Sequence, residues 1–447
     1  MKKGPVRVAI VGLGGRGKDT YAACSLRFPE KMQIVAIADP VEEKRAAVAQ
    51  MYHIPEEMCF PTAEALLQAD KLADAIFICT QDKMHYSQAM AALKKGYHVL
   101  LEKPISPNPE ECARIAAAAM DCGRHVQVCH VLRYTPFYQE IKRILDSGRI
   151  GEVVTIQAME NVQYWHQAHS YVRGNWAREE SASPMILAKS CHDMDILLWL
   201  TGKKSRYVSS YGSLYLFRPE KAPEGAARRC MDGCRVKENC PYDAEKIYLT
   251  NKKTGLLQGK RWWPVNILNI DPTEENIRQA LREGNYGKCV YYAGNDVVDH
   301  QVVNVELEDG VTINFTMSAF TSTGGRIMKI MGTLGDIEAD MDHNIIRIGV
   351  FGEEPCVVDV KELAEDFSGH GGGDFRMVEE LLDDILEDKQ PGCGLTSIDK
   401  SVESHYLAMA AEASRLEHGR SICMEEWTAD VKKGAHEDEL LAEKGDL

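Results

Sequence analysis

A carboxylate and a lysine come together at the end of a short apolar run. Residues 98–106 read HVLLEKPIS, so the residues of a buried strand are followed directly by Glu102 and Lys103. Ligands of open α/β sheets bind at the carboxyl ends of the strands. An ammonium group placed there can hydrogen-bond a substrate hydroxyl and stabilise the alkoxide that develops from it. We therefore expect Lys103 to be catalytic and Glu102 to lie beside a bound ligand; the alternative is a solvated strand end.

A glycine-rich turn near the N-terminus predicts what that ligand is. Gly12, Gly14, Gly15 and Gly17 lie, with Arg16, in the sequence GLGGRG, which matches G-x-G-x-x-G and directly follows an apolar strand. Glycines in this context permit a tight turn and let a pyrophosphate approach a helix N-terminus. We expect a dinucleotide-binding turn, with an ordinary glycine turn as the alternative.

Asp39 ends the second predicted strand, 27 positions after Gly12. A carboxylate there can accept hydrogen bonds from both ribose hydroxyls and repels a 2′-phosphate, which favours NAD over NADP. Arg16 and Lys44 lie close enough in sequence to keep NADP open. The other interpretation of Asp39 is a helix N-cap.

The elements that position these residues alternate in the first part of the chain. Apolar strands are expected at 6–11, 34–38, 75–79, 98–101 and 126–129, with helices after them. Continuous apolar strands alternating with helices predict a parallel sheet covered on both faces. Later strands follow one another without helices, and Glu308-Asp309-Gly310 predicts a hairpin, so that sheet is expected to be mostly antiparallel.

The predicted fold class is therefore α/β plus α+β. We expect an N-terminal Rossmann dinucleotide-binding domain, and then a substrate and oligomerisation domain with a large, mostly antiparallel open sheet, an insertion and an acidic C-terminal tail. The Rossmann domain is expected at 1–130 and the second domain at 131–425. Within the second domain the insertion covers about 218–298, and the acidic tail follows at 426–447.

The composition of the 447-residue chain disfavours some classes of binding partner and cellular location. Its formal charge of −15 disfavours nucleic acid and anionic membrane surfaces. The start, MKKGPVRVAIVGLGG, lacks the pattern of a signal peptide, and the apolar runs are far shorter than the ~20 residues that cross a bilayer. Most of the 14 cysteines sit singly in apolar runs, as is typical of reduced cytosolic proteins. We expect a cytoplasmic protein.

Three cysteines have a different spacing. Cys230, Cys234 and Cys240 lie in a polar segment of the insertion, four and six positions apart. Three thiolates in a segment without a core of its own predict a structural zinc site. Free thiols or one disulfide are the alternatives. A fourth ligand is available from Asp232, Asp243 or Cys289.

Taken together, several motifs resemble the glucose-fructose oxidoreductase, inositol dehydrogenase and MocA (Gfo/Idh/MocA) family. These are GLGGRG, Asp39, ICTQDKMHYSQAMAALKKGYHVLLEKP and SCHDMDILLWL, and the similarity extends over nearly the whole chain. The resemblance implies that Lys103 is catalytic and that Pro104 shapes the turn at the nicotinamide. It also implies cofactor contacts and pocket residues; these are Thr80 and His85 along the cofactor, and Arg133 and Tyr134 at the pocket.

The same resemblance makes His192 the group that takes the proton of the substrate hydroxyl. His192 begins an apolar helix, and Asp195 lies three positions later on the same side, where it could orient the ring. Many dehydrogenases of the family carry an aspartate four positions before this histidine, whereas this chain has Ala188, followed by Lys189. Either Lys189 takes part, or the proton relay differs from that of a plain alcohol dehydrogenase.

Further residues are candidates for the substrate wall. His300 begins a strand of the second sheet, and His370 lies in SGHGGGD, which is similar to a loop of the family's NAD-retaining glycosidases. Trp165, with His166 and His169, could stack on a sugar ring. The alternative for the histidines is a role in packing.

Three functions remain open at this point. The first is an NAD-dependent oxidoreductase that acts on a secondary hydroxyl of a sugar, sugar derivative or cyclitol. The second is a glycosidase that retains its NAD and works by transient oxidation at C3, elimination and addition of water. The third is a non-catalytic NAD-binding regulator. The resemblance also implies a small carbohydrate substrate and a homo-oligomer, either a dimer or a tetramer.

Overall fold

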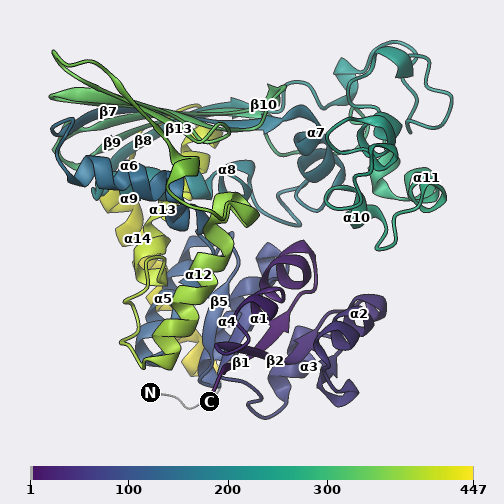
Figure 1. Ribbon diagram of the computed structural model, residues 1–447, viewed down its shortest axis with the longest axis horizontal. Helices are drawn as coiled ribbons and strands as arrows, with labels where there is room; N and C mark the ends of the chain where they lie inside the picture. The colour runs from purple at the N-terminus through teal and green to yellow at the C-terminus, as the bar shows by residue number, and fades with distance from the viewer. Residues whose placement is uncertain (1–3, 446–447) are drawn as a thin grey trace.

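The computed structural model describes residues 4–445, with side chains described up to residue 437. Two sheets lie at opposite ends of the molecule, with a layer of helices between them (Figure 1). The first is the expected parallel sheet and the second the expected large, mostly antiparallel one, so the predicted fold class is confirmed.

The parallel sheet has six strands in the order β3-β2-β1-β4-β5-β6. The strands are β1 (Val6–Val11), β2 (Met32–Ala38), β3 (Cys59–Phe60), β4 (Ala75–Ile78), β5 (His98–Leu101) and β6 (Val126–Val128). Helices α1 (Cys24–Arg27), α2 (Glu42–Tyr52), α3 (Ala63–Gln68), α4 (His85–Lys94) and α5 (Pro109–Asp121) connect them. The strand order reverses beside β1, which is where such sheets bind ligands. Strand β3 was not predicted, because a strand of two residues is too short to show a hydrophobic periodicity.

The second sheet has nine strands in the order β14-β13-β12-β11-β7-β10-β9-β8-β15. They are β7 (Val153–Gln163), β8 (Ser205–Ser213), β9 (His300–Leu307), β10 (Thr312–Thr321), β11 (Gly325–Gly332), β12 (Gly335–Asp340), β13 (Ile345–Val350), β14 (Cys356–Asp359) and β15 (Ile422–Cys423). Among the described strand pairs of this second sheet, only β7 and β10 are parallel. Four helices cover one face: α6 (Pro136–Asp146), α8 (Met185–Ala188), α9 (Cys191–Thr201) and α13 (Ile398–Leu416).

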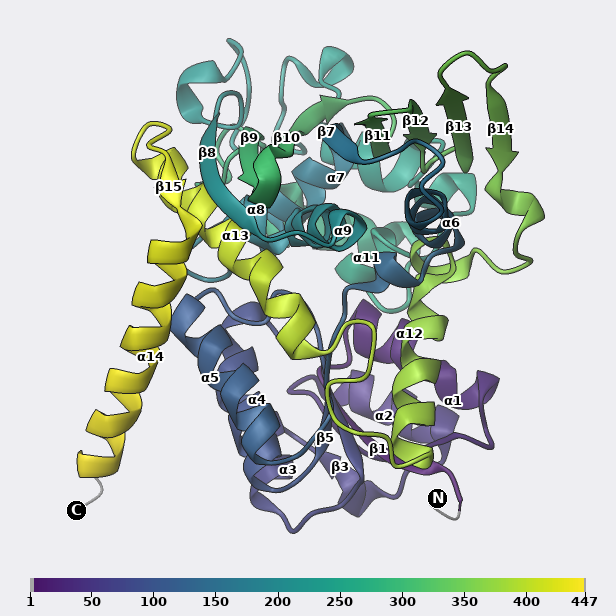
Figure 2. The same ribbon diagram turned by 90° about the vertical axis from the view of Figure 1, so that its left-hand side faces the viewer.

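The C-terminal helices return to the parallel sheet. Helix α12 (Ser368–Leu386) packs against β1, and α14 (Met424–Gly445) lies along α5 (Figure 2). The segment 426–447 was expected to be an acidic tail, but up to Gly445 it is helical, and 446–447 lie outside the described residues. Trp427 and Val431, four positions apart, give this acidic helix the apolar face that packs.

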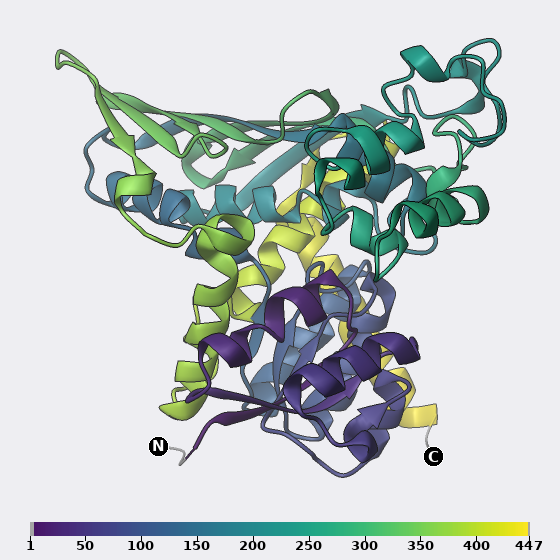
Figure 3. The same ribbon diagram turned by 45° about the vertical axis from the view of Figure 1, so that its right-hand side comes forward.

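The insertion at 218–298 forms a lobe at one end of the nine-stranded sheet (Figure 3). It contains α10 (Val265–Leu268) and α11 (Glu274–Glu283). The expectation that this segment lacks a core is wrong, because Tyr248, Leu281 and their neighbours form a buried apolar cluster. Within residues 4–445, no helix has the length and apolar character needed to cross a membrane.

Candidate active site

The glycine turn after β1 is tight on one side and open on the other. Gly12 has φ +86°, and a Cβ there would lie 2.5 Å from the carbonyl oxygen of Cys79. A Cβ on Gly17 would lie 2.0 Å from the carbonyl oxygen of Gly12. By contrast, a Cβ on Gly14 or Gly15 meets no described atom within 4 Å. The turn therefore fits a pyrophosphate on the side of Gly14 and Gly15.

This asymmetry predicts different effects for two substitutions. Gly17→Ala should lose dinucleotide binding and destabilise the protein by about 3 kcal/mol, because a methyl group clashes with backbone. Gly14→Ala should weaken dinucleotide binding but change stability by no more than about 0.5 kcal/mol. Isothermal calorimetry and urea unfolding measure the two effects. Equal loss of stability in both variants would contradict the assignment of the open side.

Arg16 holds the turn to two distant segments. Its Nε lies 2.6 Å from Glu102 Oε1 and its Nη2 lies 2.8 Å from Asp374 Oδ1. The Tyr21 hydroxyl donates to the same oxygen of Glu102 at 2.6 Å. Burial acts to raise the pKa of Glu102, but Arg16 and Lys103 outweigh it and hold that pKa below its ordinary value. Arg16 is thus engaged by two carboxylates, and Glu102 is a partner of Arg16 at the edge of the expected cofactor site.

His370 belongs to the same network. Its Nδ1 lies 3.0 Å from Asp374 Oδ2, and its ring centroid is 6.4 Å from that of His192. The loop reaches this point because Gly369, His370, Gly371 and Gly372 have positive φ. Sequence reasoning missed Asp374, although its place four positions after His370 in SGHGGGD is a visible signal.

Asp39 is held by two backbone amides just after β2. Its Oδ2 accepts a hydrogen bond from Leu13 N at 2.7 Å, and its Oδ1 accepts one from Val41 N at 2.9 Å, at the start of α2. The carboxylate therefore braces the glycine turn and closes a tight turn before α2. The alternative of a helix N-cap at Asp39 is wrong, because the N-cap of α2 is Val41 and the helix has no side-chain cap. Carboxylate oxygens have further lone pairs, which leaves capacity to accept from ribose hydroxyls.

His85 lies beneath the turn that carries Lys103. It is fully buried, with Nδ1 2.7 Å from the carbonyl oxygen of Pro104 and Nε2 3.2 Å from that of Thr80. The Thr80 hydroxyl donates to Gln88 Oε1 at 2.7 Å. The expectation that His85 runs along the cofactor is therefore corrected: its ring positions the loop after β4 against the turn after β5.

Lys103 reaches from the parallel sheet to the helix that carries His192. Its Nζ donates to the carbonyl oxygen of Ala188 at 2.7 Å, just before α9 begins. His192 is 7% exposed, and its Nδ1 has no hydrogen-bond partner among the described residues. Burial, followed by the charge of Lys103, lowers the pKa of His192 well below its ordinary value. The imidazole is neutral at pH 7, which is the form that accepts a proton.

Asp195 does not orient His192, contrary to expectation. Both of its oxygens accept from Arg133, from Nε at 2.8 Å and from Nη2 at 2.6 Å. Arg133 also donates to the carbonyl oxygen of Leu395, and the Tyr134 hydroxyl donates to Glu380. Arg133 and Tyr134 are thus buried structural residues and not part of a pocket wall, because the returning C-terminal segment covers them.

The buried ion pair of Asp195 and Arg133 should contribute measurably to the free energy of unfolding. Asp195→Asn leaves a buried guanidinium without its counter-charge, so we expect a loss of about 3 to 5 kcal/mol in the free energy of unfolding. Asp146→Asn is the control, since Asp146 is exposed and its ion pair with Lys142 contributes at most about 0.5 kcal/mol. Urea unfolding measures both variants. Similar losses would contradict a structural role for Asp195.

Lys189 joins a row of buried charges above His192. Its Nζ lies 3.1 Å from Glu160 Oε1, and Glu160 Oε2 lies 3.0 Å from Arg326 Nη2. Arg326 Nε donates to Asp193 Oδ1 at 2.6 Å. Sequence reasoning missed Glu160 and Arg326; the available signal was a charged residue in each of two expected strands. They are adjacent because β7 and β11 pair in this register.

His300 points away from this row. Glu160 and Gln301 are both partners of Met317 across the sheet, so they share the face that the helices cover. His300 precedes Gln301 and therefore faces the opposite side, where its Nδ1 lies 2.9 Å from Asp299 Oδ1. The expected place of His300 in the substrate wall is wrong, because a one-residue step reverses the face.

Trp165, His166 and His169, which were expected to stack on a sugar ring, have different surroundings in the structure. Trp165 is 8% exposed and packs in the core of the insertion, with its ring centroid 5.1 Å from that of Trp263. Its ring is therefore not accessible to a sugar. His169 lies in the same core, 2.9 Å from the Tyr248 hydroxyl. For His166, burial and then the charge of Lys189 lower its pKa well below the ordinary value, and Lys103 adds to the effect. His166 is thus the member of this segment that reaches the charges around Lys103.

Two family models match the chain in the order of its two sheets. The "Oxidoreductase family, NAD-binding Rossmann fold" matches residues 6–130, and the "Oxidoreductase family, C-terminal alpha/beta domain" matches residues 142–411. The fold and the site therefore define an oxidoreductase with an NAD-binding Rossmann domain. The chain belongs to the Gfo/Idh/MocA family, which confirms the resemblance seen in the sequence.

Relatives and solved structures agree with this assignment. The oxidoreductase YteT of Bacillus subtilis is 25% identical over 84% of this chain and 88% of its own length. Inositol 2-dehydrogenase 2 of Saccharopolyspora erythraea is 36% identical, but the match spans 44% of this chain and 55% of that relative. The WlbA dehydrogenase of Bordetella pertussis, solved with NADH and UDP-GlcNAcA, shares the fold at TM-score 0.67 and 17% identity over 95% of this chain and 99% of its own.

Proposed function

We propose that the protein is an NAD-dependent dehydrogenase that oxidises a secondary hydroxyl of a sugar, sugar derivative or cyclitol. The observation that carries this proposal is the buried His192, whose Nδ1 has no partner among the described residues, next to the segment that Lys103 binds. A proton acceptor and a fixed ammonium group are what the oxidation of an alcohol needs on the protein side.

The two residues divide the work at the hydroxyl. His192 takes the hydroxyl proton, and Lys103 stabilises the oxygen as negative charge develops on it. An ammonium group has three N–H donors, and one of them already binds Ala188 O, so two are left for the substrate. NAD, when bound, supplies the hydride acceptor. The row of Lys189, Glu160 and Arg326 offers hydrogen bonds to the other hydroxyls.

We infer that NAD is preferred to NADP. Asp39 lies at the glycine turn, where a carboxylate repels a 2′-phosphate, and Arg16 is held by Glu102 and Asp374. Calorimetric titration with each dinucleotide tests this preference, and tighter binding of NADP would overturn it.

The experiment that tests the activity follows two signals at once. The protein is incubated with NAD and a panel of free sugars, cyclitols and aryl glycosides, while NADH absorbance and aglycone release are recorded. A dehydrogenase forms NADH in proportion to the oxidised substrate. Absence of NADH with every member of the panel, in protein shown to bind NAD, would count against the proposal.

One observation favours a second candidate, a glycosidase that retains its NAD. The His370 ring is 6.4 Å from that of His192, and Asp374 holds it in the glycine-rich loop. A second histidine beside the first suits a route of oxidation at C3, elimination and addition of water, which needs more acid and base groups. Its signature in the same assay is release of aglycone without net NADH.

We also propose a homo-oligomer that forms through the outer face of the nine-stranded sheet. This face exposes the large side chains of Tyr207, Tyr211 and Ile327, which a second copy of the chain would cover. Sedimentation velocity tests the proposal, and a monomer at micromolar concentration would overturn it.

A further inference from the structure

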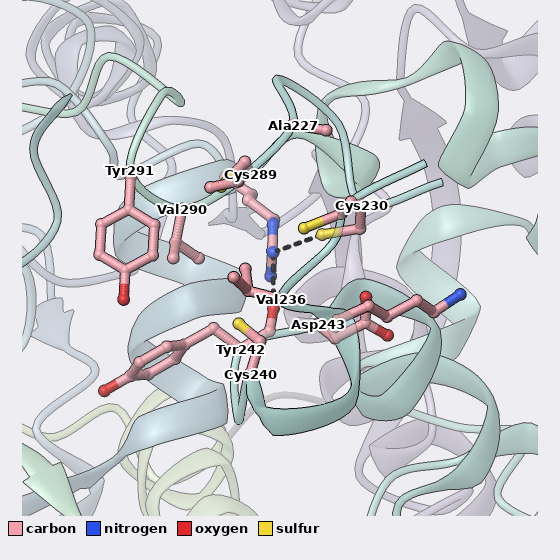
Figure 4. Close-up of a pocket in the computed structure, with 13 residues that line it drawn as sticks. Ala227, Cys230, Val236, Cys240, Tyr242, Asp243, Cys289, Val290 and Tyr291 are labelled. Atoms are coloured by element: carbon pink, nitrogen blue, oxygen red, sulfur yellow. Dashed lines mark hydrogen bonds between the residues drawn. The ribbon is translucent and has the colours of Figure 1, made fainter. Parts of the chain in front are cut away.

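Four cysteines of the insertion line one small cavity. Cys230, Cys234, Cys240 and Cys289 surround a space of about 10 Å³, and Figure 4 shows three of them with their labels. All four are free thiols. A space of this size holds a single ion or water molecule.

Backbone pairing explains how Cys289 joins the other three. Residues 229 and 288 form an isolated antiparallel bridge. The amide of Cys230 donates to Gly287 O at 3.0 Å, and that of Cys289 donates to Arg228 O at 2.9 Å. The two cysteines are therefore held as diagonal neighbours across the bridge, although they lie 59 positions apart in the sequence. Of the three open choices for a fourth ligand, Cys289 and Asp243 line the cavity, and we choose Cys289 because it supplies a fourth thiolate.

Arg173 supplies a second, independent observation. It lines the same cavity at 4% exposure, with Nη2 at 3.6 Å from Cys230 Sγ. Its Nε and Nη2 donate to the carbonyl oxygens of Lys288 and Tyr242, but its Nη1 is buried without a partner. No carboxylate of residues 4–437 lies within ion-pair distance of Arg173. Asp243 also lines the cavity, although it forms no ion pair with Arg173. A buried guanidinium without an ion-pair partner is costly, so Arg173 favours further negative charge in the cavity.

We propose that Cys230, Cys234, Cys240 and Cys289 bind one structural Zn²⁺, with Arg173 as the counter-charge. Four thiolates around Zn²⁺ carry a net charge of −2, which satisfies the guanidinium. Each thiol gives its proton to solvent as its sulfur binds the metal. No three of these four described sulfur atoms lie within 4.8 Å of one another. Binding of the ion would therefore have to draw the thiols around the cavity inward to the Zn–S distance of about 2.3 Å. A site closed by four protein ligands has no position for substrate, so the ion is structural.

Another group in the structure is closer to ligand geometry but needs no ion. His125, Asp384 and Cys393 have ligand atoms within 4.8 Å of one another. The Cys393 thiol already donates to Asp384 Oδ2 at 3.3 Å, and Lys389 Nζ lies 3.0 Å from Asp384 Oδ1. A lysine thus occupies the place of a cation. Cys393 serves as the matched control for the proposed site.

The zinc site would fix the lobe next to the catalytic centre. Arg173 ends the segment that begins with Trp165 and His166, and its side chain donates to Tyr242 O and Lys288 O in the two segments that carry the cysteines. The metal therefore holds in place the segment that brings His166 toward Lys103. This role is independent of which reaction the protein catalyses.

The first test is the metal content of the full chain, purified without added zinc and without chelator. Mass spectrometry of metals should find about one zinc per chain. Cys234→Ser and Cys289→Ser should lower it below about a tenth, whereas Cys393→Ser should leave it unchanged. Less than about a tenth of an equivalent of zinc in the wild type, or iron with inorganic sulfide in its place, would overturn the proposal.

A second test uses the wild-type protein, so it does not depend on how the variants fold. Alkylation followed by peptide mass spectrometry should show these four cysteines protected, and exposed once a strong chelator removes the metal. Replacement of zinc by Co²⁺ should give the near-ultraviolet thiolate-to-cobalt absorption. Disulfides among the four cysteines, or alkylation that the chelator does not change, would overturn the assignment.

Discussion

Lys103→Met is expected to lower kcat/KM by about 1000-fold while NAD still binds. The substitution keeps the length of the side chain but removes the ammonium group that stabilises the substrate oxygen. Its hydrogen bond to Ala188 O is lost as well, so the loop before α9 loosens. Steady-state kinetics with the best substrate of the panel measures the effect, and calorimetry measures NAD binding.

Lys94→Met is the control, because Lys94 is exposed on α4, within the same domain. It should keep wild-type kinetics. Unchanged activity in Lys103→Met would contradict the proposed chemistry and would favour the third hypothesis, a protein that binds NAD without turning over a substrate.

His192→Asn should lower kcat by about 100-fold to 10,000-fold, with a much smaller change in KM. Asparagine keeps a polar group of similar size but cannot accept the proton. Because burial and Lys103 depress the pKa of His192, the neutral form persists as the pH falls through 6.5. The wild-type kcat should therefore show no loss near pH 6.5 that depends on this residue.

His53→Asn controls for the loss of a histidine. His53 is exposed after α2 with φ +56°, a conformation that asparagine also adopts. We expect it to match the wild type in kcat and in its pH profile. A kcat of His192→Asn within about threefold of the wild type would remove His192 from the reaction.

The sequence was informative where a function depends on residues that are close together in the chain. The turn at Gly12 to Gly17 and the strand that ends just before Glu102 and Lys103 are each set by a short stretch, and both lie where expected. Local periodicity also identified most strands of the two sheets. The acidic helix α14 was missed because its apolar face has few residues, and charge dominates its composition.

Pairings over long distances were not predictable in the same way. Asp195 was assigned to His192 from helical spacing, but Arg133 lies 62 positions away and binds it with two hydrogen bonds. The face that His300 presents depends on the register of β9 with β10. In each case the deciding partner is far away in sequence, and local spacing contains no information about it.

The path of α12 has a consequence for how the chain acquires its structure during synthesis. Met377, Val378 and Leu381 of this helix belong to the same apolar cluster as Ile10 and other residues of the parallel sheet. Lys31 adds an ion pair to Glu379 at 2.8 Å. The nucleotide-binding half, although it is translated first, must therefore wait for most of the remaining polypeptide before its core closes. We expect a ribosome-bound intermediate to expose an apolar patch beside β1 until α12 has been synthesised.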